Sequence, residues 1–271
     1  MHHPLISVIT PCYNQGQYVE DAIQSIPYEK VNFDIEHIII DDGSTDSFSL
    51  QKFKELEESG TNIIHQENKG LATTRNIGIS MAKGKYIIPL DADNKLNDVY
   101  FTKAIDILEQ HDNIDVVYGD FTVFGTGQRT HETGDFDICN MIEWNKIDAC
   151  AIFRKSAFDR VDGYDTNMVF GCEDWDLWLN LYFNGSNFYY LPEVAFYYRV
   201  TSQSMLQNIT EPNKQVIRQY LYKKYHQQII EVLLKRKNDA EAYSRQLLKY
   251  KNAEKQTIKA TLKLLLKGSI I

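Results

Sequence analysis

The sequence contains few cysteines and no long apolar run. Its cysteines form no CxxC pair and have no metal-finger spacing, which argues against a disulfide framework or a zinc finger and favours free thiols in a reducing compartment. They are Cys12, Cys139, Cys150 and Cys172. No run of about 18 apolar residues is present that could cross a bilayer. Residues 1–4 show no start of a signal peptide, so we expect a cytoplasmic protein.

Basic residues are scarce over most of the 271-residue chain. Residues 1–211 contain 15 Lys and Arg against 33 Asp and Glu, a net charge of −18. Residues 212–271 contain 14 against 4, a net charge of +10. The acidic body argues against a nucleic-acid partner. The change of sign predicts two parts of the chain with different roles.

Apolar runs of strand length alternate with helical patterns at the start of the chain. Strands are predicted over residues 5–10, 35–40, 62–65 and 85–90, and helices over 17–26, 48–58 and 71–82. This alternation favours an α/β fold with a parallel sheet covered on both faces. Further helices are predicted over 98–110 and 174–183, and further strands over 116–124, 149–153, 188–191 and 194–198.

Polar clusters follow three of the predicted strands, in residues 11–16, 41–46 and 91–94. Because open parallel sheets bind ligands at the carboxyl ends of their strands, we expect these clusters to converge. The third cluster is the most informative, since a buried strand ends there in Asp91 and Asp93. Two neighbouring carboxylates at a strand tip need water, a cation or a ligand to neutralise them. We therefore interpret the pair as a site that holds a divalent metal against a phosphate.

Five segments of the sequence resemble the inverting family 2 glycosyltransferases, which have the GT-A fold. They are residues 6–14, Asp-Asp-Gly-Ser-Thr-Asp at 41–46, residues 68–76, Asp-Ala-Asp at 91–93 and Glu-Asp-Trp-Asp-Leu-Trp at 173–178. One Asp-x-Asp motif is a weak signal, whereas five clusters in the family's order and spacing are specific. The resemblance covers residues 4–204.

The resemblance implies both a fold and an activity. The fold is a GT-A, Rossmann-like nucleotide-binding domain over residues 1–211, with a mostly parallel sheet flanked by helices, followed by a helical tail over 212–271. The activity is metal-dependent transfer of a sugar, with inversion, from a nucleotide diphosphate sugar. A UDP-sugar is the expected donor, and a hydroxyl of a glycan or lipid-linked acceptor the expected target, in surface polysaccharide biosynthesis.

By resemblance, Asp42 reads the nucleotide base by accepting a hydrogen bond from the ring N–H of uracil. Thymine and guanine carry a ring N–H as well, whereas the matching nitrogen of cytosine has none. The other interpretation of Asp42, an N-cap of the following helix, is equally open to Ser44 or Asp46. The base pocket is completed by Pro11, Tyr13 and Asn14. Tyr13 either stacks on the base or is an ordinary core aromatic.

The candidates for binding the phosphates of the nucleotide are Arg75, Asp91 and Asp93. Arg75 can reach a phosphate or hold the aspartates of the loop, and a surface ion pair is the alternative. By resemblance, Asp93 ligates a Mn²⁺ or Mg²⁺ ion that bridges the phosphates, and Asp91 contacts the ribose or ligates through water. Mg²⁺ commonly takes one or two protein carboxylates, so two aspartates suffice. Many relatives have Arg-x-His after the last strand, but here Thr201 replaces the His, which leaves a third protein ligand open.

By resemblance, Asp174 is the general base that deprotonates the acceptor hydroxyl. Glu173 beside it would raise the pKa of Asp174 by like-charge repulsion, whereas the N-terminus of the helix would lower it, and the sequence leaves the balance open. Trp175 and Trp178 fit a buried helix face, so Trp144 is the candidate for stacking on the acceptor.

Two other classes of protein are weighed against this interpretation. Sugar nucleotidyltransferases begin with a Gly-rich loop that contains Arg, whereas residues 11–16 contain one Gly and no basic residue. A non-catalytic module that binds a sugar nucleotide or glycan has no use for a base, and Asp174 together with Asp91 and Asp93 argues against it. The motifs do not specify the donor sugar, the acceptor or the linkage.

Residues 212–271 lie outside the resemblance and are predicted to be helical. Apolar residues recur every four positions, and a polar segment at 235–239 interrupts the stripe. Lysines on one face and Leu or Ile on the other are typical of a helix on an anionic membrane surface, which suits a lipid-linked acceptor at the inner face of a membrane. Packing on the catalytic domain and pairing between two copies are the alternatives, and the oligomeric state stays open.

Overall fold

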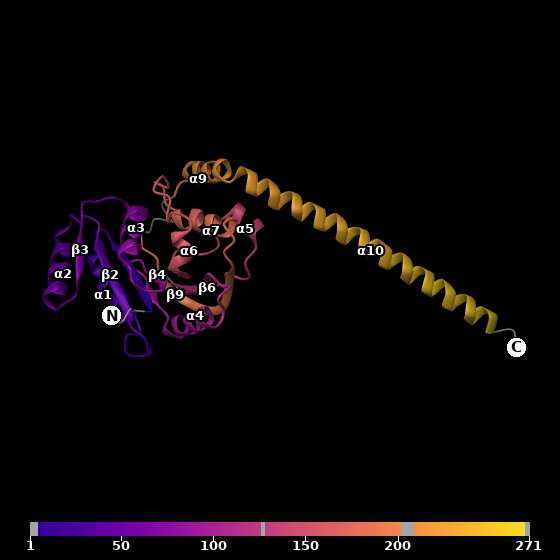
Figure 1. Cartoon of the computed structure of the whole chain (residues 1–271), viewed down its shortest axis with the longest axis horizontal. Helices are drawn as coiled ribbons and strands as arrows, with labels where there is room; N and C mark the ends of the chain where they lie inside the picture. Colours follow the sequence, from indigo (N-terminus) through magenta and orange to yellow (C-terminus); the bar gives the residue numbers. More distant parts are fainter. Residues whose placement is uncertain (1–4, 126–127, 202–208, 269–271) are drawn as a thin grey trace. The chain divides into compact units, whose positions relative to one another are not determined.

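The computed structural model describes residues 5–125, 128–201 and 209–268. Its contacts divide the chain into two compact units, Met1–Leu221 and Tyr222–Ile271. The first unit is built on one sheet with the strand order β3-β2-β1-β4-β8-β6-β9-β5, and β7 pairs with β6 off this path (Figure 1).

The first four strands of the sheet are parallel, as predicted. They are β1 (Ile6–Cys12), β2 (Ile35–Asp41), β3 (Ile63–His65) and β4 (Tyr86–Pro89). Every residue of β1 is buried, as expected of a central strand with both faces covered. β1 runs on through Pro11 and Cys12, which the sequence placed in a turn, so the polar loop begins at Tyr13.

The rest of the sheet is mixed. β8 (Ile152–Arg154) is antiparallel to β4 and to β6 (Val116–Phe124), whereas β9 (Phe188–Arg199) is parallel to β6. The short strands β5 (Lys95–Leu96) and β7 (Arg129–His131), which the sequence did not predict, pair antiparallel with β9 and β6. The predicted fold class, an α/β sheet that is mostly parallel, flanked by helices and followed by helices at the C-terminus, is confirmed.

The two strands predicted over 188–191 and 194–198 are one strand, and this prediction was wrong. The pairing of β9 with β6 is irregular around Pro192, which has no N–H to donate to the ladder. Gly119 of β6 lies opposite, where a Cβ would stand 2.5 Å from the Glu193 carbonyl oxygen. The proline therefore marks a bulge inside a continuous strand and not a strand end.

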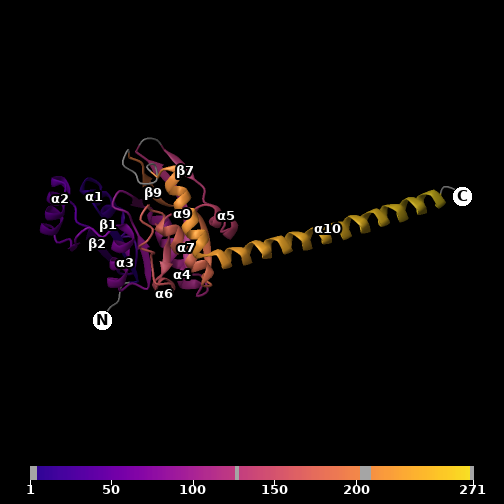
Figure 2. The ribbon, with the colours of Figure 1, turned by 90° about the horizontal axis from the view of Figure 1, so that it is seen from above.

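Helices cover both faces of the sheet. α1 (Gly16–Ser25) and α4 (Asp98–Gln110) share a core with Ile6 and Val8 of β1. α3 (Leu71–Met81) packs on the opposite face, so closely that a Cβ on Gly78 would lie 2.5 Å from Ile9 Cγ2. Figure 2 shows α1 and α2 (Ser47–Glu58) gathered beside β1 and β2. α1, α2 and α3 follow the carboxyl ends of the parallel strands β1, β2 and β3, so their first turns lie at one edge of the sheet.

α7 (Glu173–Phe183) is the buried helix that the sequence predicted. Trp175 and Trp178 are fully buried core residues, as expected, and their indole N–H groups donate to the carbonyl oxygens of Met141 and Ile147. α5 (Ile138–Glu143) and α6 (Lys155–Asp159) were not predicted. The two indole bonds fix α5 and the loop after it against α7.

The predicted helical tail consists of two helices. α9 (Glu211–Lys224) precedes α10 (His226–Gly268), and α10 continues through the polar segment at 235–239. The apolar stripe is therefore interrupted there without ending the helix. Within the described residues, no helix combines the length and the apolar character that a membrane span requires.

Candidate active site

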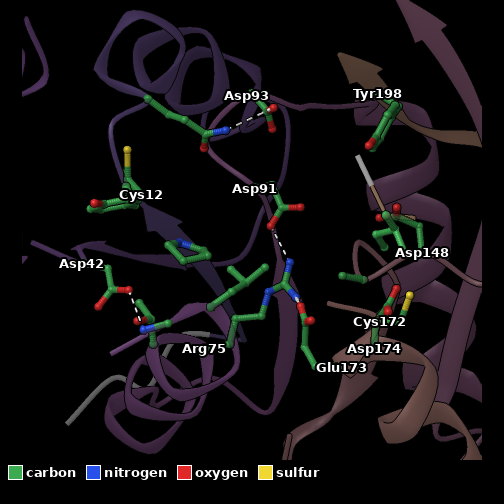
Figure 3. Close-up of a pocket in the computed structure, with 18 of the residues that line it drawn as sticks. Cys12, Asp42, Arg75, Asp91, Asp93, Asp148, Cys172, Glu173, Asp174 and Tyr198 are labelled. Atoms are coloured by element: carbon green, nitrogen blue, oxygen red, sulfur yellow. Dashed lines mark hydrogen bonds and ion pairs between the residues drawn. The ribbon is translucent and has the colours of Figure 1, made fainter. Parts of the chain in front are cut away.

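A pocket of about 880 Å³ lies at the carboxyl ends of the first parallel strands (Figure 3). It brings together segments that are far apart in the sequence, and every site residue named from the sequence lines it. These residues are Pro11, Tyr13, Asn14, Asp42, Arg75, Asp91, Asp93, Glu173 and Asp174. The expected convergence of the polar loops is thus present.

Asp42 directly follows β2, and its side chain lies at one side of the pocket, beside the start of α3. Its carboxylate accepts hydrogen bonds from Gln66 Nε2 at 2.7 Å, Lys69 N–H at 2.8 Å and Gly70 N–H at 2.9 Å. The N-cap of α2 is Asp46, which accepts from Ser49 N–H at 2.8 Å. Asp42 is therefore not used as the cap.

Tyr13 and Asn14 have different roles in the loop after β1. Tyr13 is 46% exposed, so it is not an ordinary core aromatic and its ring is open to a ligand. Asn14 adopts a left-handed conformation, φ 54°, that Asn tolerates better than most residues. Its side-chain oxygen accepts from Thr45 N–H at 2.8 Å and Asp46 N–H at 3.2 Å. Asn14 thus joins two of the polar loops.

Arg75 is buried, with a side chain 2% exposed, and is not the surface ion pair considered above. One guanidinium nitrogen contacts Asp91 and another contacts Glu173, as the dashed lines in Figure 3 show. Burial by itself lowers the pKa of Arg75, but the charges of Asp91 and Glu173 outweigh burial and raise that pKa well above its usual value. The arginine therefore links the acidic loop after β4 to the start of α7.

Asp91 and Asp93 face a third carboxylate, Asp148, across the pocket (Figure 3). Burial and then the charge of Asp91 raise the pKa of Asp93 to about 6 and that of Asp148 to about 7. Burial is the larger cause of both shifts, and the negative charge of Asp91 adds to it.

A divalent cation fits this donor set. Carboxylate oxygens are the ligands that Mg²⁺ and Mn²⁺ prefer, and only one oxygen of Asp91 is bonded to Arg75. In the described ranges no three His, Cys, Asp or Glu side chains are grouped as a metal site. Mg²⁺ usually completes its shell with phosphate and water, so a third protein ligand is not required.

Asp174 is the second residue of α7 and is partly buried in the pocket wall. One oxygen accepts from Asn145 Nδ2 at 2.9 Å and the other from Trp175 N–H at 2.8 Å. Burial, followed by the charges of Glu173 and Asp148, raises the pKa of Asp174 well above its usual value. Burial, which the sequence analysis did not consider, is the largest cause, and the charge of Glu173 acts in the same direction.

Both cysteines of the pocket are free and unreactive. Burial raises the pKa of the Cys12 thiol and of the Cys172 thiol to about 12, so both stay protonated at neutral pH. Cys172 has a left-handed conformation, φ 61°, directly before Glu173 and Asp174. It turns the chain into α7 at the point where both carboxylates enter the pocket.

Trp144, the candidate for acceptor stacking, lines the pocket but is covered by cations. Lys214 Nζ lies 5.8 Å and the Arg218 guanidinium 5.5 Å from its ring centroid, both from α9. Such contacts are cation–π interactions. An acceptor that stacked on this face would have to displace them.

Sequence reasoning missed Asp148 and Arg199. Asp148 stands just before β8, whose antiparallel direction brings its start to the edge where β4 ends. The available signal was an acidic residue that precedes an apolar run and so lies at the amino end of a strand. Arg199 ends β9 and donates from Nε to the Asp93 carbonyl oxygen at 2.9 Å, and its own N–H donates to Asn94 Oδ1 at 3.0 Å.

We expect Arg199→Met to lower the free energy of unfolding by about 2 kcal/mol, measured by urea denaturation. The change removes the bonds to Asp93 and Asp21 and the packing of the guanidinium on the ring of Tyr18. Arg160→Met, which removes a half-exposed arginine paired with Asp115, is the control and should change little. Equal stability of the two variants would contradict a role for Arg199 in holding the Asp93 loop.

Parallel strands with a carboxylate-rich pocket at their carboxyl ends are typical of open α/β folds, which bind ligands at this edge of the sheet. The model of glycosyl transferase family 2 matches residues 7–162, and the chain belongs to this family.

Two curated relatives are similar over part of their length. The glycosyltransferase GlyG of Streptococcus pneumoniae is 36% identical over 119 residues, which cover 43% of this chain and 39% of GlyG. The putative teichuronic acid biosynthesis glycosyltransferase TuaG of Bacillus subtilis is 36% identical over 107 residues, which cover 39% of this chain and 42% of TuaG. The chain thus matches about two fifths of the length of each.

Two solved structures share the fold. S. aureus TarS 1–349 in complex with UDP-GlcNAc has a TM-score of 0.62 at 19% identity, covering 78% of this chain and 62% of the other. The mannosyltransferase PcManGT from Pyrobaculum calidifontis, in complex with GDP-Man and Mn²⁺, has a TM-score of 0.56 at 18% identity, covering 76% and 59%. At these identities the likeness concerns the fold alone.

Proposed function

We propose that this chain transfers a sugar, with inversion, from a UDP-sugar to a hydroxyl of a glycan or lipid-linked acceptor in surface polysaccharide assembly. The observation that carries the proposal is the meeting of Asp42, the Asp91–Asp93 pair and Asp174 in one pocket. Family membership supports the reaction class. Relatives named for teichuronic acid and minor teichoic acid biosynthesis support the class of product. The +10 charge of residues 212–271 suits an anionic membrane surface, where lipid-linked acceptors lie.

Asp42 would recognise the base. Its Oδ1 accepts from Gln66 and Lys69, whereas its Oδ2 accepts only from Gly70 within the described part of the chain. A carboxylate oxygen accepts more than one hydrogen bond, so Oδ2 has capacity for the ring N–H of uracil. Tyr13, exposed at the same pocket, can stack on the base.

Asp93 and Asp91 would hold the divalent cation, Mn²⁺ or Mg²⁺. When bound, such an ion supplies Lewis-acid stabilisation of the departing diphosphate. Arg75 fixes one oxygen of Asp91, and Gln15 Nε2 donates to an Asp93 carboxylate oxygen at 3.3 Å, so both carboxylates are oriented before any ligand arrives. Arg199 holds the Asp93 backbone. This preorganisation reduces the entropy that binding costs.

Asp174 would accept the proton of the acceptor hydroxyl. Asn145 and the Trp175 N–H orient its two oxygens, and burial beside Glu173 raises its pKa. A general base is most effective when its pKa lies near the working pH, so the raised pKa suits this role. The hydroxyl oxygen then attacks the sugar carbon opposite the diphosphate, which leaves as the new glycosidic bond forms, and the configuration is inverted.

Asp93→Asn is expected to weaken UDP binding in the presence of Mn²⁺ by about tenfold or more, measured by isothermal titration calorimetry. The amide removes one negative charge and one anionic ligand from the proposed ion, while the size of the side chain is kept. Without Mn²⁺ this loss of affinity should be absent. Asp106→Asn, on α4 and outside the pocket, serves as the control. Unchanged affinity of Asp93→Asn with Mn²⁺ would refute the metal role.

A further inference from the structure

Three cations gather at the rim of the acidic pocket. Lys146 and Lys214 line the pocket, and Arg218 lies one helical turn beyond Lys214 on α9. Lys214 and Arg218 both approach the ring of Trp144, at 5.8 and 5.5 Å. Lys214 and Arg218 therefore cover Trp144, and Lys146 follows Trp144 by two residues and lines the same pocket.

The hydrogen-bonding capacity of these cations is largely unused. Lys146 is exposed and forms no ion pair with another described residue. The ion-pair partner of Lys214 is Glu211 at 2.7 Å, whose side chain is 72% exposed, and such surface pairs are weak. The Nε of Arg218 is buried and has no hydrogen-bond partner within the ranges that the structure describes. An unpaired buried donor costs free energy, which a ligand oxygen would recover.

The charge of the rim contrasts with that of the pocket floor. The floor carries six carboxylates and one buried arginine; the carboxylates are Asp42, Asp91, Asp93, Asp148, Glu173 and Asp174. An anionic ligand that enters without a metal ion is repelled by this floor and attracted to the rim. A second anion, in addition to the donor diphosphate, is therefore favoured at the rim formed by Lys146, Lys214 and Arg218.

That place adjoins the proposed base. Asn145, between Trp144 and Lys146, donates to Asp174 at 2.9 Å. Cys172 lies two residues before Asp174, and Lys214 is close enough for its positive charge to oppose the rise in the pKa of the Cys172 thiol. A molecule whose hydroxyl reaches Asp174 thus has Lys146 and Lys214 as neighbours.

We propose that Lys146, Lys214 and Arg218 bind a phosphate group of the acceptor, so that the acceptor is a phosphate ester whose reactive hydroxyl lies close to the phosphate. This inference rests on the proposed function, because it assigns the substrate class of the same pocket. A phosphodiester of a polymer and the diphosphate of a lipid carrier share the required chemistry. Both present oxygens that accept charge-assisted hydrogen bonds from Lys and Arg.

Trp144 provides a direct readout of the rim. The other tryptophans, Trp175 and Trp178, are fully buried, so only Trp144 reports on the pocket. The full-length protein, saturated with UDP and Mn²⁺, is titrated with a glycerol phosphate trimer, with a farnesyl diphosphate sugar and with glycerol, and tryptophan fluorescence is recorded. Phosphate binding draws Lys214 and Arg218 from the indole and changes its emission. Trp144→Phe should remove the signal.

The decisive variant is Lys146→Gln/Lys214→Gln. We expect its affinity for the phosphate probes to fall by about tenfold or more. Its affinity for UDP with Mn²⁺ should stay within about twofold. Lys30→Gln/Lys54→Gln, which removes two exposed lysines outside the pocket, carries the same charge change and should behave as the wild type.

The outcomes separate the two proposals. Binding of either phosphate probe, lost in the pocket variant alone, supports the inference, and the probe that binds identifies a polymer or a lipid carrier. If neither probe binds, if glycerol binds equally well, or if the pocket variant binds like the wild type, the inference is overturned. Absence of UDP binding with Mn²⁺ would instead count against the proposed donor chemistry. In that case, titration with the phosphate probes in the absence of UDP and Mn²⁺ still tests whether the rim binds phosphate.

Discussion

Asp174→Asn is expected to reduce sugar transfer by at least about a hundredfold while UDP affinity stays within a few-fold. The amide keeps the size of the side chain and its contact with Trp175 N–H but cannot take a proton from the acceptor. Loss of general base catalysis typically costs roughly 10²–10⁴ in rate. Single-turnover transfer with a radiolabelled UDP-sugar, beside UDP calorimetry, measures the two effects separately. Asp162→Asn, an exposed residue outside the pocket, is the matched control.

The pH dependence of transfer gives a second readout of Asp174. A base acts in its deprotonated form, so activity should rise with pH as Asp174 loses its proton. Because burial and Glu173 raise the pKa of Asp174, this rise should lie above the usual range of an aspartate. The residual activity of Asp174→Asn should lack the rise. Wild-type turnover in the variant, or an identical pH profile, would refute the assignment of the base.

Arg75→Met should cost about 3–5 kcal/mol of folding free energy and abolish transfer. The change leaves Glu173 buried and Asp91 half-buried without their cation, and an uncompensated buried charge is strongly destabilising. It also frees the loop that carries Asp93 from the start of α7. Urea unfolding followed by circular dichroism measures the loss of stability, and UDP binding with Mn²⁺ measures the loss of the organised site.

A surface arginine or lysine with two acidic partners should not behave in this way. Lys52 pairs with Glu20 and Glu55 at 3.2 and 3.1 Å, and both carboxylates are about half exposed, so Lys52→Met should change the unfolding midpoint little. Arg75→Met/Glu173→Gln should recover part of the stability lost in Arg75→Met, because the buried charge is removed with its partner. Equal losses in the single and double variants would show that Arg75 acts by packing alone.

The parallel half of the fold was predictable from local patterns. Strands β1, β2 and β4 are apolar runs bounded by polar turns, and the rule that ligands bind at strand carboxyl ends placed Asp42, Asp91 and Asp93 together. Periodicity and turn chemistry were sufficient to predict these strands and the convergence of their loops.

The mixed half was less predictable because strand direction is set by long-range packing. Nothing in residues 149–153 indicates that β8 is antiparallel, so Asp148 was missed. Arg75 and Glu173 are 98 residues apart, and neither local sequence predicts that they pair. Lys214 and Arg218 were interpreted as part of a basic helix face, and only the structure shows that they cover Trp144 at the pocket.

The most direct test of the central claim is a crystal structure of the protein with UDP and Mn²⁺. We predict that an Asp93 oxygen lies about 2 Å from the ion, within ligand distance. The uracil N–H should donate to Asp42, and Asp174 should face the open side of the diphosphate, where the sugar and the acceptor meet. A nucleotide bound outside this pocket, or an ion that Asp93 does not contact, would contradict the account.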